Sequence, residues 1–479
     1  MNSQEVAAEA VPLIVDLDGT LLSTDLLHES ILNFVAKDPV KALQMPAWLK
    51  DGKAGFKRRL TGLTTPDFET LPLNPAVIAE IEAARAQGRK VILVTASDQI
   101  YADQIGEHVG LFDEVHGSDG TTNLGAEAKA AFLVERFGKG GYDYIGDSRA
   151  DLPVWASARD AIVVRSHRNL DVRATGTVRE IETQDGGTKA LIRALRPHQW
   201  FKNTLIAVPM LTAYHFDGPT ILMVALAFIC FSLTASGVYI INDLLDLPSD
   251  RRHPRKQKRP FAAGVVPVML GVKVAAGLWL VSFLIALAVL PGAFVLTLIV
   301  YFVATFAYSL VLKKRAIVDI CTLTGLYSLR VIAGGTATGI LISPWLLAFA
   351  MFFFLALAAV KRQAEMTDLA HNDPTRKTGR PYEVEDLPVI REIAVAAGYA
   401  SVLVMALYIN STTAERIYPL PEALWMICPL LLYWMTRLVM VTHRGRMHDD
   451  PIVFALRDRV SIAVACGILL SAVIAWTGL

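Results

Sequence analysis

From residue 203 onward the chain contains a series of long apolar runs, and these constrain its fold more than any other feature. A run of about 20 apolar residues can cross the hydrocarbon core of a bilayer as a helix. We place nine such runs at 203–218, 219–241, 266–290, 292–312, 317–340, 343–360, 389–410, 421–440 and 459–478. Eight spans remain an alternative, because the first run contains Pro209 and the fifth contains Arg330. A soluble all-helical protein is disfavoured, because the rest of the chain could not cover so much apolar surface.

Lysine and arginine are concentrated in every second connection between these runs. The connections 242–265, 313–315, 361–391 and 437–459 contain twenty of them, whereas the four opposite connections contain only Arg416. Positively charged loops mark the cytoplasmic side of a membrane protein. We therefore expect these loops in the cytoplasm of a bacterium, in its inner membrane, with the C-terminus outside. The N-terminus does not resemble a cleaved signal peptide, so the first domain should lie on the cytoplasmic side as well.

The first 170 residues mix charged, polar and apolar positions as a soluble domain does, and they contain four short motifs in order. "VPLIVDLDGTLL", "KVILVTAS" and "YDYIGDSRAD" are apolar strands that end in polar residues, and a helical stretch follows "GSDGTTNLGAEAK". The carboxyl ends of buried strands meet at one crevice of a sheet. The residues that these motifs contribute are Asp16, Asp18, Thr95, Lys129, Asp147 and Asp151.

This set of motifs resembles the haloacid dehalogenase superfamily of phosphohydrolases over roughly residues 10–170. The resemblance implies an α/β Rossmann-like domain in which Asp16 is the nucleophile and Asp18 the general acid/base. It also implies that Thr95 and Lys129 bind phosphoryl oxygens. A carboxylate can attack a phosphate dianion only when cations neutralise the repulsion between them.

The same resemblance implies a Mg²⁺ site formed by Asp16, Asp18, Asp147 and Asp151, since Mg²⁺ prefers oxygen ligands. Residues 23–80 are helical in pattern and fit an insert that covers the site as a cap. The insert does not reveal the substrate. A domain that kept the fold but lost its activity is the alternative, although no catalytic position is missing.

Residues 171–200 are predicted to be a linker that ends in an amphipathic basic helix lying at the membrane interface. Its segment "TKALIRALRPHQWFKN" leads into Lys202 and Asn203, which stand where the first span begins and could meet a phosphate.

The stretch "NDLLDLPSDRRHPRKQKRPFAAG" follows the second apolar run. Asp243, Asp246 and Asp250 are spaced so that a continuous helix would place all three carboxylates on one face. Carboxylates gathered in this way repel one another unless a divalent cation binds between them, and Mg²⁺ so held completes its shell with substrate phosphates. The basic residues that follow, among them His253, suit a second anion. The alternative, a solvated basic loop, does not explain the acidic face.

Residues 195–479 resemble the UbiA-type intramembrane prenyltransferase superfamily, whose NDxxDxxxD motif matches Asn242, Asp243, Asp246 and Asp250. The resemblance implies an all-α membrane bundle that binds a diphosphate through Mg²⁺. The second aspartate-rich loop of that superfamily is replaced here by "AAVKRQAEMTDLAHNDPTRKTGRPYEVEDL".

That departure, with "DICTLTGLYSLRVIAGG" and "MHDDPIVFALRDR", resembles the decaprenyl-phosphate phosphoribosyltransferase branch. The resemblance implies phosphoribosyl diphosphate and a polyprenyl phosphate as substrates. Asp319 and Arg330 are candidates because they are ionisable residues in a span, although an ion pair between them that only orients helices is equally open. Asp449, Asp450 and Asp458 are weaker candidates. The substrate-binding candidates of this half are Lys202, Asn203, Asn242, His253, Lys256, Arg259, Tyr308, Lys313, Asp319, Arg330, Lys361, Arg362 and Glu365.

The sequence thus predicts a phosphatase domain (1–170), a linker (171–200) and a membrane transferase domain (201–479), with Mg²⁺ in both enzymatic domains. Together they would make polyprenyl-phosphoryl-ribose in two steps. One rival is an aromatic prenyltransferase with a regulatory phosphatase-like domain, and another is a transporter or lipid-binding scaffold. No feature points to a nucleic-acid partner, and the oligomeric state stays open.

Overall fold

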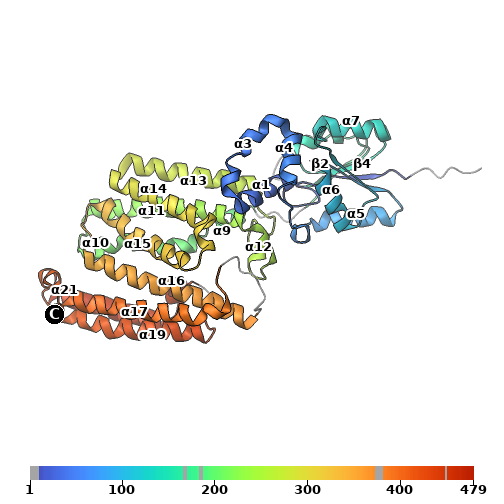
Figure 1. The fold of residues 1–479 in the computed structure, drawn as a ribbon. Coiled ribbons are helices and arrows are strands. Elements are labelled where there is room, and N and C mark those ends of the chain that lie inside the picture. Colours follow the sequence, from blue (N-terminus) through green and yellow to red (C-terminus); the bar gives the residue numbers. More distant parts are fainter. Residues whose placement is uncertain (1–9, 165–169, 183–186, 373–380, 448–449) are drawn as a thin grey trace, which may run out of the picture. The chain divides into compact units, whose positions relative to one another are not determined.

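The computed structural model describes residues 10–164, 170–182, 187–372, 381–447 and 450–479. Asp449 therefore lies outside the described residues. The chain forms two compact units, the first made of Met1–Arg196 with Tyr239–Ala276 and the second of Pro197–Val238 with Gly277–Leu479 (Figure 1). The loop that follows the second apolar run thus belongs to the unit that contains the N-terminal domain.

Six parallel strands form the sheet of the first unit in the order β3-β2-β1-β4-β5-β6. Their bounds are β1 (Leu13–Val15), β2 (Val91–Asp98), β3 (Glu114–Ser118), β4 (Asp143–Gly146), β5 (Ala161–Val164) and β6 (Val178–Ile181). All three residues of β1 are buried because helices cover both faces of the sheet. The predicted α/β domain is confirmed. Its last strand, β6, lies within the segment predicted as linker.

Helices of the first unit pack on the sheet according to strand alternation. Leu13 and Val15 belong to a core cluster that includes Ile81 of α5 and Ile105 of α6, whereas Ile14 belongs to a cluster on α7 and α8. Adjacent strand residues point to opposite faces, so each face receives its own helices. The bounds are α5 (Pro75–Ala86), α6 (Gln99–Val109), α7 (Ala126–Phe137) and α8 (Leu152–Ser157), with the short 3-10 helix η3 (Arg149–Asp151) before α8.

A helical insert leaves the sheet after β1 and returns before α5. Its helices are α1 (Leu26–Lys37), α2 (Pro39–Ala42), α3 (Met45–Trp48) and α4 (Gly52–Thr61), around a small core that contains Phe34, Trp48 and Phe56. The two ends of the insert form a neck, in which Leu22 and Leu73 make a β-bridge and Ser23 N donates to Pro72 O at 2.9 Å. The predicted cap insert is therefore present as a compact piece joined to the sheet by two adjacent chain segments.

The rest of the first unit is the short helix α9 (Gly187–Leu195) and the chain around α12 (Leu247–Arg252) and the 3-10 helix η5 (Lys256–Lys258). Arg251 of α12 donates two hydrogen bonds to Glu29 of α1, at 2.8 and 2.6 Å, and both side chains are buried. Glu29 also accepts from Thr24 Oγ1 at 2.6 Å. This ion pair fixes the loop to the insert within the unit.

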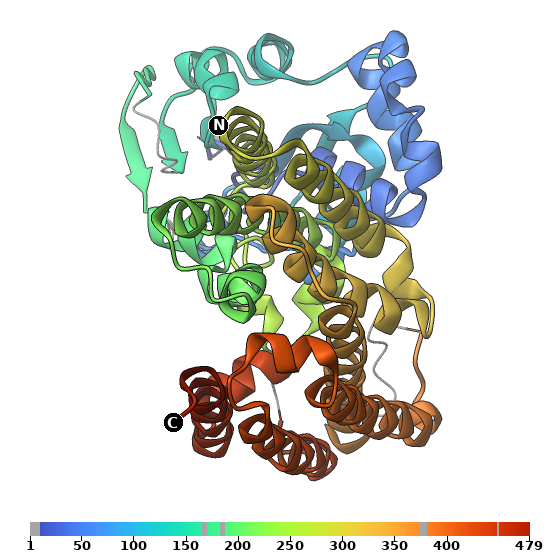
Figure 2. The same ribbon diagram turned by 90° about the vertical axis from the view of Figure 1, so that its left-hand side faces the viewer.

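Seven helical segments of the described chain are long and apolar enough to cross a membrane. Three of them are Gly218–Leu245 (α11), Val268–Val289 (α13) and Gly292–Leu310 (α14), and a fourth, Pro344–His371, lies within α16 (Pro344–Asn372). The others are Val384–Ile409, which joins η7 (Val384–Asp386) to α17 (Leu387–Ile409), Pro421–His443, which joins η8 (Pro421–Met426) to α19 (Ile427–His443), and Arg459–Thr477 (α21). In the second unit α16, α17, α19 and α21 pack in sequence, and the turned ribbon shows them side by side (Figure 2). The predicted multi-span α bundle is confirmed, although nine was only an approximate count of its spans.

The two remaining predicted spans differ from the seven in physical terms. Residues 203–218 form the end of a 3-10 helix, η4 (Pro197–Ala207), and the short helix α10 (Val208–Thr212), because Pro209 starts a new helix there. The fifth, α15 (Val318–Thr338), has the length of a span but buries the ionisable Asp319 and Arg330, which lower its apolar character.

Candidate active sites

Three carboxylates meet at the carboxyl end of the sheet in the first unit. Asp16 directly follows β1, Asp147 directly follows β4, and Asp151 closes η3. One ligand oxygen from each lies within 4.8 Å of the others, so the group could hold a metal ion. Gly19 has a φ of +80°, and a Cβ there would lie 2.5 Å from Asp147 Oδ2. Only glycine therefore lets the chain turn this close to the acidic group.

A buried hydrogen-bond network orients these carboxylates. Lys129 Nζ donates to Asp16 Oδ1 at 2.6 Å and to the Tyr144 hydroxyl at 2.9 Å. Tyr144 in turn donates to Asp151 Oδ1 at 2.6 Å, while Asp151 Oδ2 accepts from the Ser148 N–H and hydroxyl at 3.0 and 2.9 Å. Asp151 thus has few rotamers open to it, and its position is set before any ligand binds.

The charge balance of this group favours a divalent cation. Burial raises the pKa of Asp16 to about 7, although Lys129 acts in the opposite direction. Burial, together with repulsion from Asp16 and Asp151, raises the pKa of Asp147 to about 8. Burial alone would lower the pKa of Lys129, but the carboxylates of Asp16 and Asp151 raise it. Three carboxylates against one ammonium leave two negative charges, which one Mg²⁺ would balance, so this donor set fits the ion.

Asp18 is directed elsewhere. Its Oδ1 accepts from Leu26 N at 2.8 Å, at the start of the insert, and its Oδ2 accepts from the Ser97 hydroxyl at 2.6 Å. Burial raises the pKa of Asp18 to about 6, and the charge of Asp25 adds to this effect. The metal group of the described residues does not include Asp18, so its predicted role as a metal ligand stays a prediction. Thr95 is fully buried, and its hydroxyl accepts from Ser97 N at 3.0 Å.

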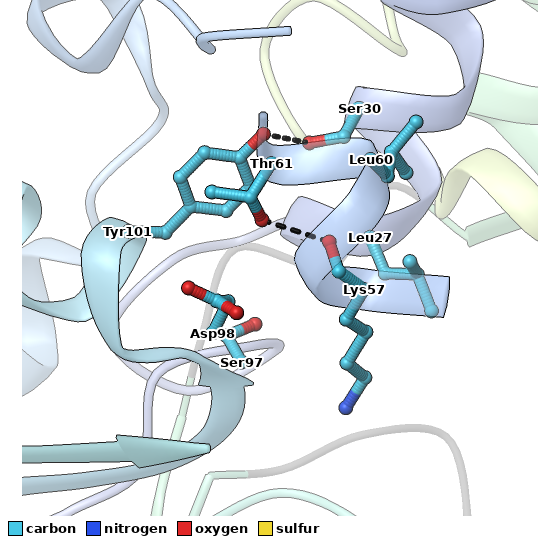
Figure 3. Close-up of a pocket in the computed structure, with 8 residues that line it drawn as sticks. All are labelled: Leu27, Ser30, Lys57, Leu60, Thr61, Ser97, Asp98 and Tyr101. Atoms are coloured by element: carbon cyan, nitrogen blue, oxygen red, sulfur yellow. Dashed lines mark hydrogen bonds between the residues drawn. The ribbon is translucent and has the colours of Figure 1, made fainter. Parts of the chain in front are cut away.

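A pocket beside Asp18 contains residues that the sequence did not single out. It lies between the insert and the end of β2, and Figure 3 shows Lys57 on the insert side and Ser97, Asp98 and Tyr101 on the sheet side. Lys57 Nζ donates to Ala96 O at 2.5 Å and to Asn123 Oδ1 at 3.0 Å. The position of Ser97 and Asp98 just after Thr95 was a usable signal, but no sequence pattern places Lys57 here.

The NDxxDxxxD motif also belongs to the first unit, but its carboxylates are arranged differently from those of Asp16, Asp147 and Asp151. α11 ends at Leu245 and α12 begins at Leu247, so Asp246 stands at a break rather than inside the predicted continuous helix. Arg259 donates to Asp243 Oδ1 at 3.1 Å and to Asp250 Oδ2 at 2.5 Å. Arg196 donates to Asp243 Oδ1 at 2.6 Å. Arginine side chains therefore join the two buried carboxylates of the motif.

The other residues of this motif have their own partners. Asn242 Nδ2 donates to Asp246 Oδ2 at 3.0 Å, and burial raises the pKa of Asp250 even though Arg259 acts against it. His253 Nδ1 accepts from Arg255 N at 3.2 Å, and the side chain of Lys256 is exposed. Oxygen ligands for Mg²⁺ are thus present, and Arg259 and Arg196 already neutralise part of the charge of Asp243 through its Oδ1.

In the second unit two lysines share one carboxylate. Lys202 Nζ donates to Asp450 Oδ2 at 2.6 Å, and Lys361 Nζ lies 3.2 Å from the same oxygen. Burial would raise the pKa of Asp450, but Lys361 and Lys202 hold it well below its usual range. Lys202 also lies over the Tyr327 ring, 5.8 Å from its centroid. Asp450, which was a weaker candidate from the sequence, is therefore the residue that both lysines contact.

Asp319 and Arg330 are each held by other partners in the same unit. Arg362 Nε lies 2.5 Å from Asp319 Oδ2, and the Tyr308 hydroxyl donates to Asp319 Oδ1 at 2.8 Å. Arg330 donates to Asn203 Oδ1 at 2.9 Å and to the Tyr301 hydroxyl at 3.0 Å.

The remaining candidates of the second unit are Glu365, Lys313 and Asp458. Arg362 also contacts Glu365, and Lys313 is buried. Asp458 pairs with Arg437 at 2.7 Å and caps α21, which is a structural role.

Comparison with known proteins identifies both parts of the chain. The family model described as the UbiA prenyltransferase family matches residues 204–477. The chain belongs to the UbiA prenyltransferase family. Upstream of this UbiA part, the haloacid dehalogenase-like hydrolase model matches residues 13–155. The fused architecture that the motifs predicted is therefore present.

Relatives of this UbiA protein match either nearly all of the chain or a part of it. The uncharacterized protein y4nM of Sinorhizobium fredii is 36% identical over 94% of this chain and 88% of its own length. Nodulation protein NoeC of Azorhizobium caulinodans is 35% identical over 58% of this chain and 91% of its own. Decaprenyl-phosphate phosphoribosyltransferase of Mycobacterium tuberculosis is 41% identical over 189 residues, which are 37% of this chain and 60% of that relative.

Proposed function

We propose that the chain is a bifunctional membrane enzyme. Its UbiA part transfers a 5-phosphoribosyl group from phosphoribosyl diphosphate to a polyprenyl phosphate, and its N-terminal domain then removes the 5-phosphate to yield polyprenyl-phosphoryl-ribose. The observation that carries the first step is the 41% identity to a decaprenyl-phosphate phosphoribosyltransferase. The observation that carries the second is the acidic group of Asp16, Asp147 and Asp151.

In the transfer step, the bond between ribose C1 and the diphosphate oxygen breaks, and a bond forms between C1 and an oxygen of the lipid phosphate. C1 acquires oxocarbenium character, which nearby carboxylates such as Asp243 stabilise. The nucleophile is already an anion, so no general base is needed. Mg²⁺ bound by Asp243, Asp246 and Asp250 would stabilise the leaving diphosphate. Arg196 and Arg259, which now contact the carboxylates, are suited to bind phosphate oxygens.

The lipid phosphate needs cations that bring it near another anion. Lys202 and Lys361 supply two, and both now contact Asp450. A phosphate that replaced Asp450 as their partner would gain two charge-assisted hydrogen bonds. Arg330 is a further cation of the same unit, and it is oriented by Asn203 and Tyr301.

In the hydrolytic step, Asp16 attacks the phosphorus of the 5-phosphate, and the bond to the ribose 5-oxygen breaks. Asp18 gives that oxygen a proton and later takes one from the water that cleaves the aspartyl-phosphate. Lys129, which contacts Asp16, neutralises the entering phosphoryl oxygens. The covalent connection between the two domains keeps the phosphorylated lipid at a high local concentration near the hydrolytic site. We place both sites on the cytoplasmic side of the bacterial inner membrane.

The test incubates the detergent-solubilised protein with a polyprenyl phosphate and labelled phosphoribosyl diphosphate. The wild type should form labelled polyprenyl-phosphoryl-ribose, and Asp16→Asn should stop at the 5-phosphorylated lipid. No labelled lipid from the wild type would disprove the transfer. Consumption of a prenyl diphosphate with an aromatic acceptor would instead favour the rival prenyltransferase. Full dephosphorylation by Asp16→Asn would disprove the coupling.

A further inference from the structure

The helical insert exposes three large apolar side chains between residues 40 and 49. Val40 is 74% exposed, Leu43 is 81% exposed and Leu49 is 59% exposed. Within the described residues 10–182 they are the most exposed large apolar side chains. Single exposed apolar residues are ordinary on a protein surface, whereas a group of them marks a surface that binds a partner or a membrane.

The core of the insert does not need these three side chains. Met45 and Trp48, from the same stretch of chain, are buried and form that core with Phe34 and Phe56. The ring centroid of Trp48 lies 5.4 Å from that of Phe34 and 6.5 Å from that of Phe56. The inward positions of the stretch are thus filled, and the three exposed side chains are left for a partner outside the insert.

Lysines flank the exposed apolar side chains along the chain. Residues 37–53 contain four lysines and two aspartates, and all four lysines are exposed, namely Lys37, Lys41, Lys50 and Lys53. Lys41 contacts Asp38 at 3.1 Å, but an exposed pair of this kind holds a lysine only weakly. Apolar side chains among lysines are typical of a segment that lies in the headgroup region of a membrane, where the lysines attract anionic lipids.

The base of the insert is attached to the chain that joins two membrane spans. Glu29 forms its buried ion pair with Arg251, and Asp67 accepts a hydrogen bond from Arg252 Nε at 2.8 Å. Both arginines lie between α11 and α13, and the first unit contains the adjoining ends of these two helices. α1 has 12 residues and is therefore about 18 Å long, so one short helix separates this attachment from the exposed side chains. The attachment keeps the insert beside the end of the spans, which favours lipid over a soluble partner.

We propose that residues 39–50, the docking segment, bind the anionic leaflet of the membrane that contains the spans. Val40, Leu43 and Leu49 enter the boundary between headgroups and acyl chains, and the neighbouring lysines pair with anionic headgroups. The docking segment thereby gives the hydrolase domain a second attachment to the bilayer, besides the chain between α11 and α13. This attachment goes beyond the proposed function and does not require that the hydrolase act on a lipid.

The test measures how close the docking segment lies to lipid in the full-length protein. A bimane fluorophore is attached at Leu43→Cys after the exposed native thiols are removed by Cys321→Ala and Cys466→Ala. The protein is placed in nanodiscs whose lipids carry nitroxide groups on their acyl chains, which quench a fluorophore only at short range. Quenching should be strong in a mixture of phosphatidylcholine and phosphatidylglycerol. It should be weaker in phosphatidylcholine alone and at high salt, because the attraction between lysines and lipid is electrostatic. Leu49→Cys serves as the second labelling site if Leu43→Cys does not fold.

Two comparisons identify the cause of the quenching. The same fluorophore at Glu135→Cys, an exposed position of α7 outside the insert, should be quenched little in either lipid. Lys41→Gln and Lys50→Gln should each lower the ratio of docked to undocked protein about fivefold, because each lysine contributes about this factor at an anionic surface. Lys139→Gln, which removes an exposed lysine outside the insert, should leave the ratio unchanged.

Absence of quenching at position 43 in both lipids, or quenching equal to that at position 135, would overturn the proposal. A docked fraction that does not change in Lys41→Gln and Lys50→Gln would do the same. Shielding of position 43 from aqueous iodide that depends on protein concentration, without quenching by lipid nitroxides, would also overturn it, because a second copy of the chain would then cover the segment.

Discussion

The first unit contains two groups of aspartates, and the negative charge of the two groups is neutralised to different extents by neighbouring cations. Asp16, Asp147 and Asp151 lie close together, and the Lys129 ammonium contacts Asp16 and Asp151. In the other group, Asp243 and Asp250 are joined by arginine side chains. The first group is electrostatically strained without a cation, whereas the second is already compensated by the chain. Counting aspartates therefore does not reveal how strongly a site requires metal, because the neighbouring cations decide it.

The largest effect is expected from Asp16→Asn, which removes the proposed nucleophile of the first group. Hydrolysis of ribose 5-phosphate should fall by a factor on the order of 10⁶, as it does when the nucleophile of a serine protease is removed. Phosphate release measures this loss, and formation of the phosphorylated lipid should persist as the control. Loss of both activities would show that the two groups are not independent.

The next effect is expected from Asp243→Asn in the compensated group. Transfer should fall about 10²-fold, because a charge that stabilises the transition state is removed. The readout is labelled lipid formed from phosphoribosyl diphosphate, and hydrolysis of ribose 5-phosphate should stay at the wild-type rate. Unimpaired transfer would favour a non-catalytic role for the motif, as the scaffold alternative requires.

A smaller effect is expected on the stability of the folded protein, which should depend on pH through Asp147 of the first group. The pKa of Asp147 is raised from 3.8 to about 8, so the folded protein holds this proton more tightly than the unfolded chain does. Without metal, stability should therefore fall as the pH rises from about 4 to about 8. Asp147→Asn should raise the melting temperature in EDTA and abolish stabilisation by Mg²⁺.

Thermal melting with and without Mg²⁺ measures this prediction, with Asp103→Asn as the exposed control. A lower melting temperature for Asp147→Asn in EDTA would contradict the account of charge repulsion in this group.

The smallest effect on activity is expected at the ion pair between Glu29 and Arg251. Removing one partner of a buried pair generally costs about 3–5 kcal/mol, because the other charge is left uncompensated. Glu29→Gln should therefore lower the melting temperature, and Glu29→Leu with Arg251→Met should recover part of the loss. Equal melting of Glu29→Gln and the wild type would mean that the pair does not tie the loop to the insert.

Sequence patterns predicted the parts of the site that depend on topology. Asp16 and Asp147 had to meet because both follow parallel strands, whose carboxyl ends share one edge of the sheet. The orientation of Asp18 could not be predicted, because it depends on the backbone of Leu26 in the insert. The same holds for Arg259, whose contacts with Asp243 and Asp250 depend on how an irregular loop folds back.

In the membrane part, the length of the apolar runs predicted most of the spans. It did not predict which side chains pair with the buried charged residues. Arg362 pairs with Asp319 from a different helix, and Asp450 contacts both Lys361 and Lys202, the latter across slightly more than half of the chain. Sequence spacing has no information about such distant pairs. The same limit explains β6, which is short and exposed and is recognised as a strand only by its pairing with β5.

The neck at Leu22 and Leu73 makes the insert an exchangeable module. Since its two ends are adjacent residues of one β-bridge, the intervening chain can lengthen, shorten or be replaced without moving the strands that carry the reactive carboxylates. The insert could thus change in evolution while the sheet and its acidic group stayed the same. A chimera with a foreign insert grafted at these two positions should keep the geometry of Asp16, Asp147 and Asp151, whereas Asp18 would need a new partner in place of Leu26 N.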